Sequence, residues 1–155
     1  MDEIRLRNRI DSSLAPVTSV TELNAHLESI RAVRSPLLHL SNDARDRFVR
    51  SLLFSPAGLA SFDYRDLVHE LSASQAYEVL RLFGMQHTIR SMPGLRIETS
   101  LDKAILGSGV RPAFCTVHPI VKTGILCDDD HWHNMKCGSP GTCRGEVGSI
   151  CTSNC

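Results

Sequence analysis

The sequence predicts a mainly α-helical fold, in which a small helical bundle precedes an irregular Cys-rich C-terminal tail. Two observations support this prediction. Between residues 19 and 106, apolar side chains recur at three- and four-residue steps, in stretches that begin with good N-cap residues. All six cysteines, by contrast, lie after residue 114. We therefore expect a helical body (residues 1–109) and a Cys-rich segment (residues 110–155).

The helices of the body are predicted from their caps and their apolar faces. Ser19 and Glu22 form a capping-box pattern ahead of an apolar stripe that runs to residue 34. Shorter helices are predicted over residues 42–54, 64–71, 72–84 and 101–106, with Ser41, Asp63, Ser72 and Ser100 as caps. Residues 1–13 form a weak helix or a frayed arm, and residues 95–98 a short strand. Because short amphipathic helices cannot bury their apolar faces alone, they should pack as a bundle.

The Cys-rich segment differs in composition from the body. It is rich in Gly, Pro, Ser, Thr and Asp, and it has no helical period. A segment of this kind cannot build an apolar core. Cross-links or a metal ion must therefore hold it if it is ordered.

Charge and hydropathy exclude several classes of partner. Lys and Arg total 17, as do Asp and Glu, so the formal net charge is zero. A nucleic-acid clamp or a polybasic membrane binder needs an excess of positive charge. The N-terminus lacks the apolar core of a secretory signal, and no apolar run is long enough to span a bilayer. We therefore expect the chain to be cytoplasmic, where thiols stay reduced unless a metal or an enzyme uses them.

Hydroxyl residues are interspersed with the thiols of the Cys-rich segment. Dehydration of Ser or Thr gives an electrophilic alkene, and a nearby thiolate adds to it to close a thioether ring. The candidate thiol donors are Cys115, Cys127, Cys137, Cys143, Cys151 and Cys155. The candidate acceptors are Ser139, Thr142, Ser149 and Thr152.

This arrangement resembles the precursors of ribosomally synthesised and modified peptides, above all the lanthipeptides. The resemblance implies that a leader is recognised by a dehydratase or cyclase, and that a peptidase or exporter releases the modified core. The stretch LDKAILGSG is similar to a leader–core junction, which makes Gly107, Ser108 and Gly109 the cleavage region. The product would be secreted, with the antimicrobial role typical of the family. The chain itself would be no enzyme and would need no catalytic residues and no cofactor.

Two alternatives remain open from the residues. In the first, the segment binds zinc or copper, since thiolate and imidazole suit both metals. The candidate ligands are then Cys115, His118, Cys127, His131, His133 and Cys137. In the second, the six cysteines form three disulfides in an exported miniprotein, for which about fifteen connectivities exist.

Overall fold

The protein, in a computed structural model, is described over residues 3–107, 115–117, 125–127 and 131–155, with β3 and β4 described by their backbone. Its elements, in chain order, are α1 (Glu3–Ser13), α2 (Val20–Glu28), η1 (Pro36–His39), α3 (Asn42–Ser51), β1 (Leu53–Ser55), β2 (Gly58–Asp63), α4 (Arg65–Glu70), α5 (Ala73–Arg81), η2 (Gln86–Ser91), α6 (Ser100–Leu106), β3 (Cys115–Val117), β4 (Ile125–Cys127), β5 (His131–Ser139) and β6 (Thr142–Thr152). None of the helices in these ranges has the length and hydropathy that a bilayer crossing requires.

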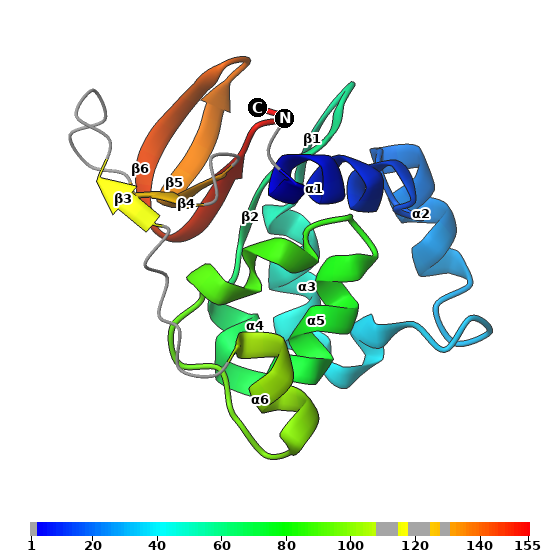
Figure 1. Ribbon diagram of the computed structural model, residues 1–155. Helices are drawn as coiled ribbons and strands as arrows, with labels where there is room; N and C mark the ends of the chain where they lie inside the picture. The colour runs from blue at the N-terminus through cyan, green and yellow to red at the C-terminus, as the bar shows by residue number, and fades with distance from the viewer. Residues whose placement is uncertain (1–2, 108–114, 118–124, 128–130) are drawn as a thin grey trace.

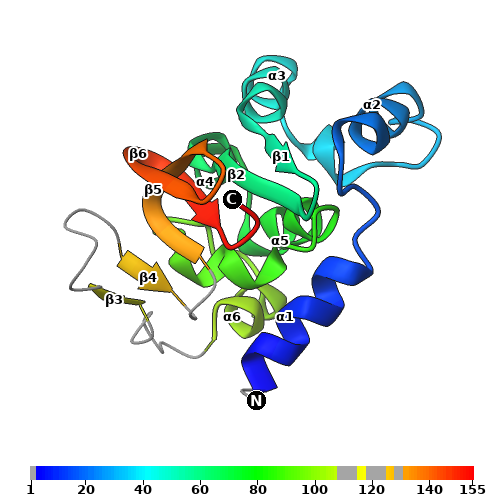
Figure 2. The same ribbon diagram turned by 90° about the horizontal axis from the view of Figure 1, so that it is seen from above.

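The predicted fold class, a helical bundle followed by an irregular tail, is wrong. The described strands form one six-stranded sheet in the order β1-β2-β6-β5-β4-β3, and every neighbouring pair is antiparallel. The Cys-rich segment supplies four of these strands, and β6 pairs directly with β2 of the body. Figure 2 shows the sheet from above, with β3 at one edge and β1 at the other. The prediction failed because backbone pairing and cross-links order this segment without an apolar period.

The hairpin β1–β2 also departs from expectation, because the helix predicted to reach residue 54 ends at Ser51. Residues 58–62 are buried without interruption, so the strand lacks the alternation that marks a half-exposed one. The turn Pro56-Ala57 then joins two strands instead of two helices. This hairpin gives the body the strand on which the Cys-rich segment docks.

Three of the five predicted caps are confirmed, whereas Asp63 does not cap α4, whose N-cap is Tyr64. The side chains of Ser19 and Ser41 accept hydrogen bonds from backbone amides at the starts of α2 and α3. Ser72 and Gln75 form the predicted capping box at α5. In contrast, Thr99 rather than Ser100 caps α6, and the predicted strand at 95–98 is reduced to an isolated bridge between Ser72 and Arg96.

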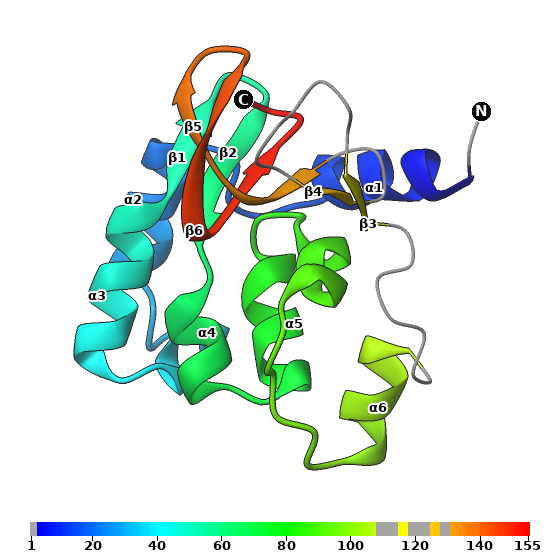
Figure 3. The ribbon, with the colours of Figure 1, turned by 90° about the vertical axis from the view of Figure 1, so that its left-hand side faces the viewer.

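The core lies between the sheet and the helices that cover it. Figure 1 and Figure 3 show the β5–β6 ribbon above α4, α5 and α6. Phe48 packs edge-on against Phe62 and Phe83, with ring centroids 6.4 and 6.1 Å away. Ile150 of β6 is fully buried in the same cluster. The Cys-rich segment therefore shares the apolar interior of the body.

Candidate functional site

The hairpin β5–β6 bends sharply at Asn134. His133 pairs with Ile150, and Met135 pairs with Gly145. Between these two pairs, β5 has the single residue Asn134, whereas β6 has the four residues 146–149. Asn134 has φ 58° and Gly148 has φ 88°. Asn is one of the few residues besides Gly that tolerate this left-handed conformation. Its Oδ1 accepts a hydrogen bond of 3.1 Å from the Gly148 amide, which fixes the two sides of the bend together.

The bend folds the tip of the hairpin back over its base, as Figure 3 shows from the side. Cys143 and Cys151 are separated by 8 positions in the chain. In a straight strand that separation would span about 26 Å. Their Cα atoms are 6.1 Å apart. At the tip, the Gly141 amide donates a 2.7 Å hydrogen bond to the Cys155 carbonyl. We call residues 131–155 the folded-over hairpin.

Two disulfides link the tip of the folded-over hairpin to its base. Cys137 and Cys143 lie opposite each other in the register, yet they are not bonded to each other. Cys137 is bonded to Cys155, and Cys143 to Cys151. Each such cross-link typically stabilises a fold by about 2–4 kcal/mol, because it restricts the unfolded chain. Outside this hairpin, the backbones of β3 and β4 place Cys115 directly opposite Cys127.

The folded-over hairpin docks on the body through the pairing of β6 with β2. Ser61, Phe62 and Asp63 face Cys151, Ile150 and Ser149 in the register. The buried Thr152 hydroxyl donates hydrogen bonds of 2.7 and 3.1 Å to the carbonyls of Leu59 and Ala60. The Asn154 side-chain amide donates a further bond of 3.2 Å to the Leu59 carbonyl. These contacts hold the C-terminus against the strand of the body.

Two histidines of β5 face the body rather than solvent. His131 is fully buried, and its Nε2 lies 2.7 Å from the Ser91 hydroxyl. His133 Nε2 lies 2.6 Å from the Tyr64 hydroxyl, with the two rings stacked at 5.5 Å between centroids. Burial, followed by the proximity of His131, lowers the pKa of His133. Burial also raises the pKa of Tyr64, so both partners favour their neutral forms.

The predicted Cys/His metal ligands that the structure describes do not come together, because each has a different partner. His131 and His133 are hydrogen-bonded to side chains of the body, whereas Cys137 is bonded to Cys155. His118 and the side chains of Cys115 and Cys127 lie outside the described residues. Within the described ranges, the group of three or more side chains that could hold a metal ion is Cys143, Cys151 and Cys155.

The predicted thioether acceptors fall into two classes of exposure. Ser139 and Thr142 are exposed at the tip of the hairpin, whereas Ser149 and Thr152 are buried against β2. Gly107 ends α6 with φ 73°, and Ser108 and Gly109 lie outside the described residues. Modifying enzymes would therefore reach the two tip residues in the docked state.

Several residues that shape the site carry no signal in the sequence. Ser91 and Tyr64 contact the two histidines from 40 and 69 positions away in the chain. Asn134 sets the bend, and Asn154 fixes the end of the chain. Pairing across the sheet and the bend of the hairpin bring these side chains to their partners. A pattern confined to one segment could not have identified them.

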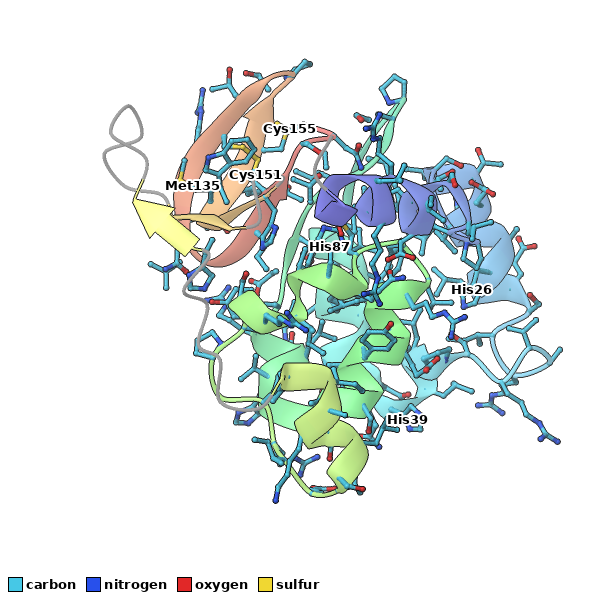
Figure 4. All side chains as sticks on the ribbon, viewed as in Figure 1. His26, His39, His87, Met135, Cys151 and Cys155 are labelled. Atoms are coloured by element: carbon cyan, nitrogen blue, oxygen red, sulfur yellow. A yellow bond between two sulfur atoms is a disulfide. The ribbon has the colours of Figure 1, made fainter. Side chains whose placement is uncertain are left out.

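Figure 4 shows the two parts in contact, with Cys151 and Cys155 in the ribbon above and His87 in the helical body. The His87 ring meets the His131 ring edge-on, with centroids 5.7 Å apart. The candidate site is thus a disulfide-linked hairpin held on a thiol-free body. Comparison of the chain with protein-family models, with curated proteins and with solved structures finds no match in any of the three.

Proposed function

We propose that this chain is a precursor: the helical body holds the Cys-rich segment in one shape while its cross-links form, and the segment is then cut off and exported. In this proposal the chain is no enzyme. Its partners are a peptidase with an exporter, and the enzymes that form the cross-links. An antimicrobial role for the product follows from the resemblance to lanthipeptide precursors alone.

Covalent isolation of the Cys-rich segment is the observation behind this proposal. Residues 1–114 contain no cysteine, so no disulfide can join the body to the segment. Both described disulfides also close within the folded-over hairpin. A single cut between α6 and β3 would therefore leave the two parts connected by noncovalent contacts alone. Gly107, at the end of α6, begins the expected cleavage region.

The body supplies what the segment lacks, which is a fixed register. A strand interrupted by a wide bulge can pair in several registers, and a slip of one residue exchanges its two faces. Pairing with β2 places Cys151 opposite Ser61 and sets Ile150 into the core. The addition of a strand to an exposed sheet edge is a common mode of peptide recognition. We infer that β2 selects the register in which the tip cysteines meet their partners.

Disulfides are the cross-links that the described geometry favours, and each requires a thiol oxidant that removes two electrons and two protons. Thioethers are the alternative, for which Ser139 and Thr142 are the exposed acceptors. Cys155 Sγ lies 3.4 Å from the Ser139 carbonyl oxygen, so a thiol is close to an acceptor residue. Intact mass separates the two, because a disulfide loses two hydrogens and a modified Ser or Thr loses one water.

The test compares cross-linking with and without the body. The full chain is reduced and reoxidised, then cut at a protease site that replaces residues 108–114. We expect one dominant product, with Cys137 joined to Cys155 and Cys143 to Cys151. The matched control is a peptide of residues 115–155 oxidised alone, which should give a mixture of pairings. Equal yields of the same pairing in both would show that the body has no templating role.

A second measurement addresses release itself. The product made in the native host is isolated and its mass determined. We expect a fragment that begins between residues 107 and 115 and carries its cross-links. A mature product that still contains the helical body would contradict the precursor function.

A further inference from the structure

Four sulfur atoms converge where the tip of the folded-over hairpin meets its base. The Sγ atoms of Cys143, Cys151 and Cys155 all lie within 4.8 Å of one another. Cys137 is bonded to Cys155, so its sulfur belongs to the same cluster. Figure 4 shows sulfur gathered between the strands beside the labels of Cys151 and Cys155. The two disulfides are therefore neighbours in a single site.

This spacing suits a tetrahedral zinc ion. Zinc binds cysteine sulfur at about 2.3 Å, so the sulfurs at the corners of a tetrahedron lie about 3.8 Å apart. The Cys155 sulfur lies within 4.8 Å of the sulfurs of Cys143 and Cys151, which are bonded to each other. Opening the two disulfides lets the bonded sulfurs move apart to the distance that the metal requires.

The backbone keeps the four cysteines together without the disulfides. Cys137 and Cys143 stay opposite each other through the β5–β6 register. Pairing with β2 holds Cys151, and the hydrogen bond from Gly141 holds Cys155. Reduction breaks none of these backbone hydrogen bonds chemically, so they favour the same ligand arrangement in the reduced chain.

Access and charge also favour a metal at this place. Cys137, Cys143 and Cys155 are half-buried, so a reductant and a metal ion can reach them. The Arg144 side chain packs against Gly138, beside Cys137. Its positive charge offsets part of the net negative charge that four thiolates around a divalent ion carry.

We propose that the reduced chain binds one Zn²⁺ through the thiolates of Cys137, Cys143, Cys151 and Cys155, and that oxidation to the two disulfides expels the metal. A low-molecular-weight thiol such as glutathione supplies two electrons and two protons for each disulfide, and becomes a disulfide itself. The four protein thiols then lose their protons as the metal binds. This ligand set contains no histidine and differs from the mixed Cys/His set expected from the sequence. Zinc bound in this way would keep the four thiols ordered in a reducing compartment.

The experiment uses the full chain, reduced anaerobically with a phosphine and loaded with Zn²⁺ or Co²⁺. A Cys115→Ser/Cys127→Ser background removes the two cysteines outside the hairpin. We expect one Zn²⁺ per chain that resists a chromophoric chelator. Co²⁺ should give the intense visible and near-ultraviolet bands of tetrahedral thiolate coordination. Oxidation of the hairpin should release the ion.

Single substitutions then test the ligands one at a time. Loss of a residue that only hydrogen-bonds to a metal ligand costs about 10- to 100-fold in metal affinity. Loss of a ligand itself, in Cys143→Ser or Cys151→Ser, should therefore cost at least about 100-fold. The matched control is His131→Gln/His133→Gln, which should retain the metal. Hydrogen exchange at the amides of β6 reports whether each variant still docks on β2.

X-ray absorption of the zinc-loaded full chain, with no substitution in the hairpin, counts the sulfur ligands even if a variant fails to fold. Four sulfurs and no nitrogen support the site. Loss of zinc in a histidine variant whose β6 amides stay protected, nitrogen bound to the zinc, or no zinc retained against the chelator would each overturn it. None of these results affects the precursor proposal, because the disulfide pairing is measured separately on oxidised protein.

Discussion

The helical body and the folded-over hairpin reach a defined structure by different means. The body buries a cluster of Leu, Val, Ala and aromatic side chains and contains no cysteine. The hairpin buries few apolar side chains, chiefly Met135 and Ile150, and relies on two disulfides and on pairing with β2. The patterned part is held by an apolar core, whereas the unpatterned part is held by a partner strand and by covalent links.

The largest effect should come from the aromatic core of the body. Phe48 is buried and packs against Phe62 and Phe83, so Phe48→Ala removes contacts to both rings. Loss of a buried Phe costs about 3–5 kcal/mol. We expect a cooperative loss of both helix and sheet in thermal unfolding, while the disulfides persist. If only the helices melt and the docked sheet remains, the two parts do not share a core.

Ile150→Ala tests the shared core from the other side. Ile150 belongs to the Cys-rich segment but is fully buried among residues of the body. We expect the free energy of unfolding of the whole chain to fall by about 2–5 kcal/mol, measured by urea denaturation. The matched control is Val147→Ala on the same strand, because Val147 is 78 % exposed. That control should change stability by less than about 0.5 kcal/mol.

Removal of one disulfide should affect the hairpin more than the body. Cys137→Ala/Cys155→Ala removes a cross-link of the kind that contributes about 2–4 kcal/mol. We expect faster hydrogen exchange at the Gly141 amide, whose partner is the Cys155 carbonyl. Amides of α5 should exchange as before. Equal acceleration in both places would mean that the tip of the hairpin opens only when the whole chain unfolds.

The bend at Asn134 should be sensitive to the residue that occupies it. Asn134→Ala places a residue with poor tolerance for positive φ at a position with φ 58° and removes the bond to Gly148. The conformational part alone costs about 1–2 kcal/mol. Asn134→Gly relieves that part and loses only the hydrogen bond, so it should be the milder change. Yields of the native disulfide pairing after refolding provide the measurement.

The same contrast explains which features the sequence could predict. Ser19, Ser41 and Ser72 were found because a cap depends on residues within one turn. The hairpin β1–β2 was missed because a fully buried strand has no alternation to detect. The cysteines were recognised as special, but their pairing depends on a bend at Asn134 and on a strand some ninety positions away. Long-range contacts of this kind leave no local pattern.

The smallest expected effect is a pH dependence of docking. Because the pKa of docked His133 is lowered, the fold favours its neutral ring. The stability that neutral His133 contributes is therefore complete above the ordinary histidine pKa of about 6.5. This stability is lost as the pH falls through the lowered pKa of the docked ring. The groups around the ring are Tyr64, His131 and, beside Tyr64, the pair Asp63 and Arg65. Acidification should loosen the contact between β6 and β2.

His26 provides the comparison within the body. Burial also lowers its pKa, and its Nε2 lies 2.7 Å from the Ser35 hydroxyl, so acid should weaken α2 and η1 over the same pH range. Local hydrogen exchange at about pH 7.5 and about pH 5 separates the two contributions. His133→Gln should flatten the pH dependence at the β6 amides alone, and His26→Gln that at α2. The exposed His39→Gln should change neither. If acid protects the β6 amides, or if His133→Gln leaves their pH response intact, the imidazole at the Tyr64 contact does not control docking.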